Sequence, residues 1–335
     1  MRVSIPQGFK VFSPPLFDRT DIWNGNELGS LSVKLLFTTF YRSLVELGYD
    51  VCEETSDINL NWGGGGNNIK QKTLFFEHAW APRFAYQFSN TGVNYNHACT
   101  QIPYSDIDAL ELDRLEKYRM CVLKHYTLRL NKDFHEPKND FILVPLQSPR
   151  NNYFIDRQSV FSKYANDKSE NAYWGIAQEI IKSVEALNID LPVVYVQDPR
   201  DTRDYDNVLS TKLKSTFITY KDKVSIHDYF SSDKCKLVVG INTNALNEAI
   251  FWNKKVLSFG ELIESGSSRI IPSNVDELSS FEDANYWKYL DRLYRNTWFL
   301  SDFADPMIVK CIIDTDKYVD RIKTYQNVYG TLGFI

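Results

Sequence analysis

Several features that would define a class of protein are missing from this sequence of 335 residues. Acidic side chains (43) slightly outnumber basic ones (38), so no basic field exists that would attract nucleic acid or an anionic membrane. No apolar run reaches the roughly 18 residues that a transmembrane helix needs. The amino terminus lacks the charged and then apolar layout of a secretory signal. We therefore expect a cytoplasmic protein without a transmembrane segment.

The sequence also lacks the common signatures of metal and phosphate sites. The cysteines form no C-x-x-C pair, which argues against a disulfide framework and a zinc site; they are Cys52, Cys99, Cys121, Cys235 and Cys311. Asp204-Tyr205-Asp206 has the letters of a metal-binding Asp-x-Asp motif but follows no predicted strand, so we predict no metal and no cofactor. The glycines at 63–66 lack the Gly-Lys-Ser/Thr ending of a P-loop, and a flexible turn and a substrate-contacting loop both stay open.

What the sequence does contain is an alternation of helices and apolar strands in both halves. A helical pattern at 31–47 runs into a strand at 49–52, and strands at 141–147 and 192–196 flank a helix at 172–187. This alternation predicts an α/β fold with two Rossmann-like parallel-sheet domains. We place the first domain at 1–136, the second at 137–300 and a helical segment that packs back across the domains at 301–335.

The clearest single unit spans residues 237–260. An apolar strand (237–241) runs into a polar turn, a short helix (245–252) follows, and a second apolar strand (256–259) ends at Gly260. In a parallel sheet, ligands bind at the carboxyl ends of the strands, where the start of a helix offers free N–H groups to an anion. We predict that this unit binds a nucleotide-linked donor substrate through Asn242, Thr243, Asn244 and, one helical turn later, Glu248. Helix capping by the turn and dipole stabilisation by Glu248 are the alternatives.

A carboxylate and an imidazole, Glu77 and His78, follow an apolar strand at 73–76. Both are suited to proton transfer, but neighbouring residues on a strand point to opposite faces, so we expect at most one of them to face a substrate. The alternative is a pair that only satisfies hydrogen bonds in a loop. Acidic residues of the first loop, at 13–30, are rivals for the same catalytic role and would lie on the acceptor side; they are Asp18, Asp21 and Glu27.

Two more strands of the second half end in polar residues. Gln147 and Ser148 follow the strand at 141–147, and they are candidates for contact with the donor. Arg200 lies in a mixed-charge loop after the strand at 192–196. For this arginine, contact with a diphosphate and a place in a solvated loop are both open.

Several of these stretches, in this order, resemble the capsule polysaccharide biosynthesis glycosyltransferases related to the bacterial β-Kdo transferases, which have a GT-B-type architecture. The strand at 142–147 is similar to the family's strand that ends in a donor-site glutamine, here Gln147. Ile226-His227-Asp228 and the segment 240–248 are similar to the family's I-H-D and N-S-x-x-x-x-E-A signatures. The resemblance implies donor-binding roles for His227 and Glu248. It also implies two Rossmann-like domains facing a cleft, with the acceptor-side domain at 1–136 and the nucleotide-sugar-binding domain at 137–300. It covers most of the chain, although each motif is short.

The first half shows the same resemblance with departures. Leu60 to Gly63 looks like the family's turn with Trp62, and Phe76 to Arg83 lies where the family has its catalytic carboxylate, which places Trp62 and Arg83 on the acceptor side. His78 occupies the position of the family's catalytic aspartate, beside a retained Glu77. Asp198-Pro199 stands where the family has His-Pro. Both departures leave the donor sugar and the stereochemical outcome open.

These patterns together predict a metal-independent glycosyltransferase that moves a sugar from a nucleotide-sugar donor to a glycan or oligosaccharide acceptor. Glu77 or His78 would take the acceptor proton, and the turn before the helix would stabilise the leaving phosphate. A non-catalytic protein that binds a nucleotide or sugar on the same scaffold is one alternative, and a sugar-nucleotide epimerase is another.

Overall fold

The computed structural model describes residues 1–4, 25–52, 57–62, 72–82, 84–91, 97–147, 161–164, 169–198, 201, 203, 216–219, 222, 224–262, 270–279, 283–316 and 318–330. The chain divides into two compact units. Unit 1 combines Met1–Ile102 with Arg292–Ile335, and unit 2 is Pro103–Asp291. This division differs from the boundaries predicted at 136/137 and 300/301, because residues 103–136 group with unit 2 and the carboxyl-terminal segment from 292 onward groups with unit 1.

Unit 1 contains a five-stranded sheet with the order β2-β1-β3-β4-β5. Its strands are β1 (Arg2–Ser4), β2 (Asp50–Cys52), β3 (Ile58–Trp62), β4 (Lys72–His78) and β5 (Tyr86–Ser89). β1 to β4 pair in parallel, whereas the edge strand β5 runs antiparallel to β4 because a short turn joins the two. The Rossmann-like arrangement predicted from the sequence is confirmed, and the antiparallel edge strand is an addition to it.

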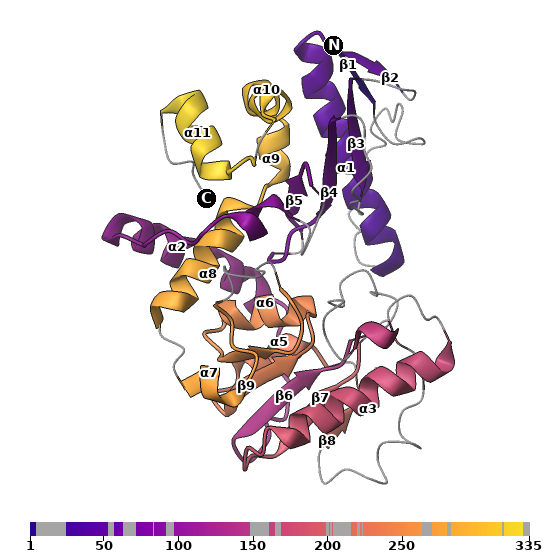
Figure 1. Ribbon diagram of the computed structural model, residues 1–335, viewed down its shortest axis with the longest axis vertical. Coiled ribbons are helices and arrows are strands. Elements are labelled where there is room, and N and C mark those ends of the chain that lie inside the picture. The colour runs from indigo at the N-terminus through magenta and orange to yellow at the C-terminus, as the bar shows by residue number, and fades with distance from the viewer. Residues whose placement is uncertain are drawn as a thin grey trace. The chain divides into compact units, whose positions relative to one another are not determined.

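Aromatic side chains from distant parts of the sequence form the core of unit 1. Helix α1 (Gly25–Glu46) lies alongside β3 and β4 (Figure 1). Phe37 and Phe40 of α1 pack edge-on against Phe76 of β4, with ring centroids 5.7 and 5.5 Å apart. Phe303 of α9 (Leu300–Phe303) lies 5.6 Å from Phe40, so the carboxyl-terminal segment fills the same core. The remaining helices of this unit are η3 (Ala98–Gln101), α10 (Pro306–Asp314) and α11 (Arg321–Tyr329).

Backbone and ionic contacts also fix the carboxyl-terminal segment to the sheet of unit 1. Tyr86 and Trp298 exchange two backbone hydrogen bonds of 2.7 and 2.8 Å, which adds a bridge to the outer edge of β5. Asp302 accepts two hydrogen bonds from Arg321, at 2.9 and 3.2 Å, and both side chains are almost completely buried. Such a desolvated pair requires both partners, because removal of one leaves a buried charge without its counter-ion.

Unit 2 contains a second five-stranded sheet with the order β10-β9-β6-β7-β8, and all its pairings are parallel. Its strands are β6 (Phe141–Pro145), β7 (Val193–Val196), β8 (Thr216–Ile218), β9 (Cys235–Gly240) and β10 (Val256–Ser258). The chain runs from β6 outward through β7 to β8, and then returns to β9 on the other side of β6. The switch point of this sheet therefore lies between β6 and β9, where open α/β sheets bind their ligands.

Helices surround the sheet of unit 2. Helix α3 (Glu170–Ala186) runs along β6, β7 and β8 and packs Ile176, Ile180 and Val184 against the sheet (Figure 1). Helices α5 (Ile226–Ser231) and α6 (Asn244–Phe251) pack against β9. Further helices are α2 (Ala109–Thr127), η5 (Ser162–Tyr164), α7 (Val275–Ser279) and α8 (Asp283–Arg295), and the boundary between the units falls within α8.

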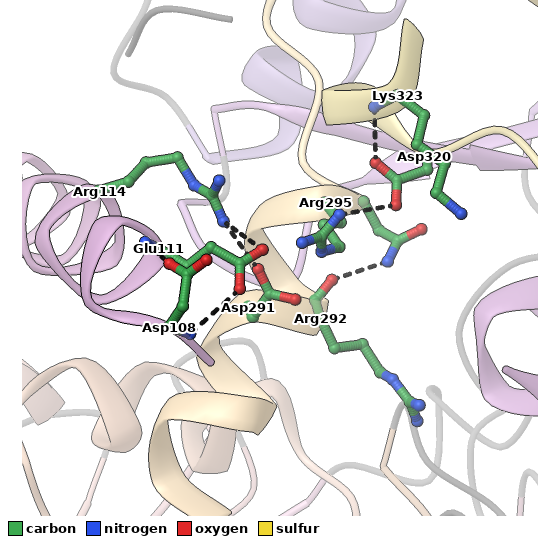
Figure 2. Close-up of polar contacts among 9 residues, drawn as sticks. Asp108, Glu111, Arg114, Asp291, Arg292, Arg295, Asp320 and Lys323 are labelled. Atoms are coloured by element: carbon green, nitrogen blue, oxygen red, sulfur yellow. Dashed lines mark hydrogen bonds and ion pairs between the residues drawn. The ribbon is translucent and has the colours of Figure 1, made fainter. Parts of the chain in front are cut away.

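Contacts made by α2 explain why this helix belongs to unit 2 and not to the first half of the sequence. Tyr118 packs edge-on against Phe251 at the end of α6, with ring centroids 5.4 Å apart. Arg119 donates a hydrogen bond of 3.3 Å to the Phe251 carbonyl oxygen. Figure 2 shows Arg114 of α2 pointing to Asp291 of α8, at 3.1 Å. These contacts link residues more than 100 positions apart, which no local sequence pattern reveals.

Candidate functional site

Two polar side chains face each other at the switch point of unit 2. Gln147 follows β6 and Asn242 follows β9, so both lie at the carboxyl edge of the sheet. The Gln147 amide nitrogen donates to the Asn242 side-chain oxygen at 2.8 Å, and the Asn242 backbone N–H donates to the Gln147 side-chain oxygen at 3.3 Å. The reciprocal pair holds the two strand ends at a fixed separation and orients the turn that leads into α6.

The turn at Asn242 to Asn244 starts α6 at this edge. Thr243 is the N-cap, and its hydroxyl accepts from the Ala245 N–H at 3.4 Å. The N–H groups of Thr243 and Asn244 have no hydrogen-bond acceptor among the residues that the structure describes. All three turn residues are partly exposed. The start of this helix can therefore donate hydrogen bonds to an anion while its capping interaction stays intact.

Glu248 lies one turn further along α6, and each of its carboxylate oxygens lies near a nitrogen of unit 2. Asn244 donates to Oε1 at 2.9 Å, and His227 Nε2 lies 3.4 Å from Oε2. The Glu248 side chain is 12 % exposed and that of His227 is 9 % exposed. The carboxylate is thus fixed in orientation and still reachable from outside.

The hydrogen bonds of His227 define its tautomer. The indole N–H of Trp252 points to His227 Nδ1 at 3.2 Å, and an indole nitrogen can only donate. Nδ1 is therefore the acceptor, and the ring proton lies on Nε2, facing Glu248. Burial lowers the pKa of His227 to about 4, with smaller contributions from Arg129 and His125, so the ring is neutral near pH 7.

Helix α2 packs against His227 through Tyr126. The Tyr126 ring stacks on the His227 ring with centroids 4.0 Å apart. The next residue, Asp228, is almost completely buried. Its carboxylate accepts from the Ser225 N–H at 3.0 Å and from the Asn131 N–H at 2.7 Å. Within the motif Ile226-His227-Asp228, the histidine therefore faces the site, and the aspartate caps α5 and holds the chain beyond α2.

The carboxyl end of β7 carries a separate polar cluster. Gln197 donates to the carbonyl oxygens of Asp201 and Arg203, at 2.7 and 2.8 Å. Asp201 forms an ion pair of 2.9 Å with Arg203, whose guanidinium lies over the ring of Tyr173 in the first turn of α3. These contacts fix Asp201 and Arg203 in the loop that also contains Arg200. Contact of Arg200 with a diphosphate stays open.

In unit 1, Glu77 and His78 are the last residues of β4, and alternation along the strand directs them to opposite faces. His78 lies on the α1 face, where Trp62 packs edge-on at 5.1 Å and the Ser32 hydroxyl is 3.4 Å from Nε2. Glu77 lies on the other face and accepts from the His78 backbone N–H at 2.9 Å. Both side chains are partly exposed, so the two candidates serve different faces of the sheet.

The structure brings together five of the predicted donor-site residues: Gln147, His227, Asn242, Asn244 and Glu248 form a connected set with Thr243 between them. Trp62 contacts His78 in unit 1. The backbone of Glu27 is part of α1. Five predicted site residues lie outside the described part of the chain: Asp18, Asp21, Arg83, Ser148 and Arg200.

Sequence reasoning missed three residues of the Glu248 network. Trp252 and Asn247 belong to the segment that was singled out, and the spacing of Asn244, Glu248 and Trp252 by four residues puts all three on one helical face, a signal that could have identified Trp252. Tyr289 of α8 donates to Asn247 at 2.5 Å, from 42 residues away, and nothing in the local sequence indicates it.

The described residues contain neither a candidate metal site nor a helix that could span a membrane. No group of three or more His, Cys, Asp or Glu side chains in this part of the chain could hold a metal ion. Among its helices, none combines the length and the apolar character required to cross a bilayer.

Comparisons with known proteins give similarities in structure only, because no family profile and no curated protein matches the chain. The β-Kdo 2,7 transferase KpsC structure from Thermosulfurimonas dismutans is 16 % identical over 85 % of this chain and 89 % of its own, with a TM-score of 0.43. The β-Kdo 2,4 transferase KpsC structure from the same organism is 11 % identical over 76 % of this chain and 86 % of its own, with a TM-score of 0.49. S. aureus MnaA in complex with UDP is 13 % identical over 92 % of this chain and 84 % of its own, with a TM-score of 0.29.

The two transferases carry the activity of the family that the sequence motifs resemble. At these identities, neither the donor substrates nor the site residues of those enzymes can be assigned to this chain.

Proposed function

We propose that unit 2 binds a nucleotide-linked sugar at the switch point between β6 and β9, and that the protein is a glycosyltransferase. The observation that carries the proposal is the pairing of two complementary groups on α6. The N–H groups at the start of the helix suit a phosphate, and the fixed carboxylate of Glu248 suits the hydroxyl groups of a ribose. The two groups are about one helical turn apart, about 5–6 Å, as are the phosphate and the ribose of a nucleotide.

In the transfer step, negative charge develops on the phosphate as the sugar leaves. The N–H groups of Thr243 and Asn244 would stabilise that charge, and such preorganised donors supply the largest electrostatic contribution in many enzymes. The acceptor hydroxyl must lose its proton, and the proposal assigns this role to Glu77 or His78. An inverting reaction requires no further group, whereas a retaining reaction with a covalent intermediate needs a nucleophilic carboxylate as well.

A thermal-shift and calorimetric titration with CMP, UDP, GDP and dTDP tests nucleotide binding. A nucleotide present at about 100 times its dissociation constant stabilises the protein by about 2.7 kcal/mol. The Glu248→Ala variant is expected to lose at least about tenfold in affinity, or about 1.4 kcal/mol. Glu179→Ala on α3 is the matched control, since Glu179 also lies on a helix of unit 2 but pairs with Lys163 at the surface. Equal affinities of both variants for the nucleotide would refute the assignment of Glu248.

Incubation with sugar nucleotides then separates the reaction classes. A transferase releases the nucleotide, slowly with water and faster with a glycan acceptor. An epimerase returns an isomerised sugar nucleotide, and a non-catalytic binding protein returns the ligand unchanged. Either of the last two results would overturn the transferase proposal while leaving nucleotide binding in place.

A further inference from the structure

We propose that Trp252 and Tyr289 are positioning residues, each at the remote end of a chain of directed polar contacts that orients Glu248. The proposal rests on the proposed function, because it takes Glu248 to be the group that contacts the nucleotide. It changes the role of His227, which acts through Glu248 and not by direct contact with the ligand.

The first chain starts at Trp252 and has only one possible direction. The indole N–H donates to His227 Nδ1 at 3.2 Å, so the ring proton must lie on Nε2, which faces Glu248 Oε2 at 3.4 Å. The Trp252 and His227 rings lie 6.2 Å apart, and both nitrogens of the imidazole are engaged within the protein. The histidine therefore has no ring nitrogen left to offer a ligand in this arrangement.

The second chain starts at Tyr289 and reaches the other oxygen of the same carboxylate. The Tyr289 hydroxyl donates to Asn247 Oδ1 at 2.5 Å, and Asn247 Nδ2 donates to Asn244 Oδ1 at 3.3 Å. Asn244 Nδ2 then donates to Glu248 Oε1 at 2.9 Å. Tyr289 and Asn247 are almost completely buried, so neither can be reached by a ligand.

The two chains have one consequence for Glu248. Asn244 donates to Oε1, and the Nε2 of His227, which carries the ring proton, faces Oε2 at 3.4 Å. The carboxylate plane is thus fixed by a donor beside each oxygen. A group held in this way binds paired hydroxyl donors without first losing rotational freedom. The direction of both chains also disfavours a glutamine at position 248. Its NH₂ group would face the N–H group of either Asn244 or His227, and two donors cannot form a hydrogen bond.

A double-mutant cycle on nucleotide affinity tests the proposal. The probe is whichever of CMP, UDP, GDP and dTDP binds most tightly to the wild-type protein. Trp252→Phe and Tyr289→Phe each keep an aromatic ring but remove the first donor of a chain, and each is expected to reduce affinity three- to tenfold. Combined with Glu248→Ala, either variant should reduce affinity by less than twofold more, because the chains act only through Glu248.

Trp174→Phe is the matched control, since Trp174 belongs to α3, packs against the core of unit 2 and is part of neither chain. It should leave affinity within twofold of wild type. Losses that persist in the Glu248→Ala background, or an equal loss in Trp174→Phe, would overturn the positioning roles, because the effects would then be structural. Circular dichroism confirms that each variant is folded, and Tyr289→Phe carries the test if Trp252→Phe is not.

A measurement without any ligand separates this proposal from the proposed function. Nitrogen-15 NMR of the wild-type protein should show the neutral His227 ring with its proton on Nε2. A ring protonated on Nδ1 would refute the first chain whether or not a nucleotide binds. The absence of binding to all four nucleotides, with the proton on Nε2, would refute the proposed function and, with it, the role of the chains in ligand binding.

Discussion

At the scale of single residues, the two catalytic candidates of unit 1 are distinguished by their surroundings. His78 is enclosed by Trp62, Ser32 and Tyr86, whose ring stacks at 6.1 Å. Glu77 points to the opposite face, where its carboxylate accepts from the backbone N–H of His78. Under the proposed function, at most one of the two contacts the acceptor.

We expect Glu77→Gln and His78→Ala to differ in turnover. The variant that removes the catalytic base should lower turnover by about 100-fold or more, the usual contribution of general base catalysis, with nucleotide affinity unchanged. The other variant should stay within a few-fold of wild type. Steady-state release of the nucleotide, with parallel calorimetry of binding, measures both quantities. Unchanged turnover in both variants would remove this site from the mechanism.

A buried histidine of unit 1 should make stability depend on pH. Burial lowers the pKa of His97 to about 3. The hydrogen bond from its Nε2 to the Phe88 carbonyl oxygen, at 2.9 Å, acts to raise this pKa, and the nearby charge of Arg292 acts to lower it. The unfolded chain, with a pKa of about 6.5, binds a proton that the folded protein does not. The stabilisation is therefore complete above about pH 6.5 and is lost as the pH falls toward 3.

Between about pH 7 and pH 4.5, we expect this residue to lower the free energy of unfolding by about 2–3 kcal/mol. Urea denaturation at both pH values measures the effect. His97→Asn keeps a side-chain acceptor for the Cys99 N–H and removes the titrating ring, so it should be less stable at neutral pH but lose less on acidification. An identical loss in the variant and the wild type would contradict the assignment to His97.

At the scale of elements, capping residues determine where the helices of unit 2 begin. Asp108 accepts from the Glu111 N–H at 2.8 Å and Glu111 accepts in return from the Asp108 N–H at 3.4 Å, a capping box at the start of α2 (Figure 2). Ser225 and Asp228 form the same motif at α5. This cap starts the helix at Ile226.

Removal of the α2 cap should destabilise unit 2. We expect Asp108→Ala to lower the free energy of unfolding by about 1 kcal/mol, the typical value for an N-cap. Asp106→Ala is the control, because Asp106 is almost fully exposed and its ion pair with Lys288 should contribute less than about 0.5 kcal/mol. Urea denaturation of both variants measures the difference. Equal effects would mean that the capping box does not stabilise α2.

At the scale of the whole molecule, each unit has its own hydrophobic core, but only unit 2 is continuous in sequence. The core of unit 1 needs side chains from beyond residue 291, among them Trp298, Phe303, Ile308 and Ile312. Truncation of a single buried residue of this kind typically costs about 2–5 kcal/mol. The four together would cost about 8–20 kcal/mol, which is comparable to the 5–15 kcal/mol by which an average domain is stable.

A protein shortened to residues 1–291 should therefore lose the folded structure of unit 1 and keep that of unit 2. Hydrogen exchange is expected to show fast exchange at β3, β4 and β5, with protection retained at β6, β7 and β9. The same protein should still bind the nucleotide that the full chain binds. Retained protection in β4 would show that the carboxyl-terminal segment is not required for the core of unit 1.

The sequence by itself determined the elements and the chemistry of the turn before α6. The alternation of apolar strands and helices is a local property, because neighbouring residues set backbone preference and the period of burial. The strand, turn and helix around Asn244 and Glu248 lie within one or two residues of those expected. Two Rossmann-like sheets followed from that pattern.

Only the tertiary structure decided which of these elements meet. The order of the strands brings Gln147 to Asn242 across 95 positions of sequence, and α8 supplies Tyr289 to a network on α6. The packing of α2 on α6 and of α9 and α10 on α1 set the limits of the two units. Such contacts depend on the shape and burial of surfaces that exist only after the sheets have formed, so no local pattern in the sequence records them.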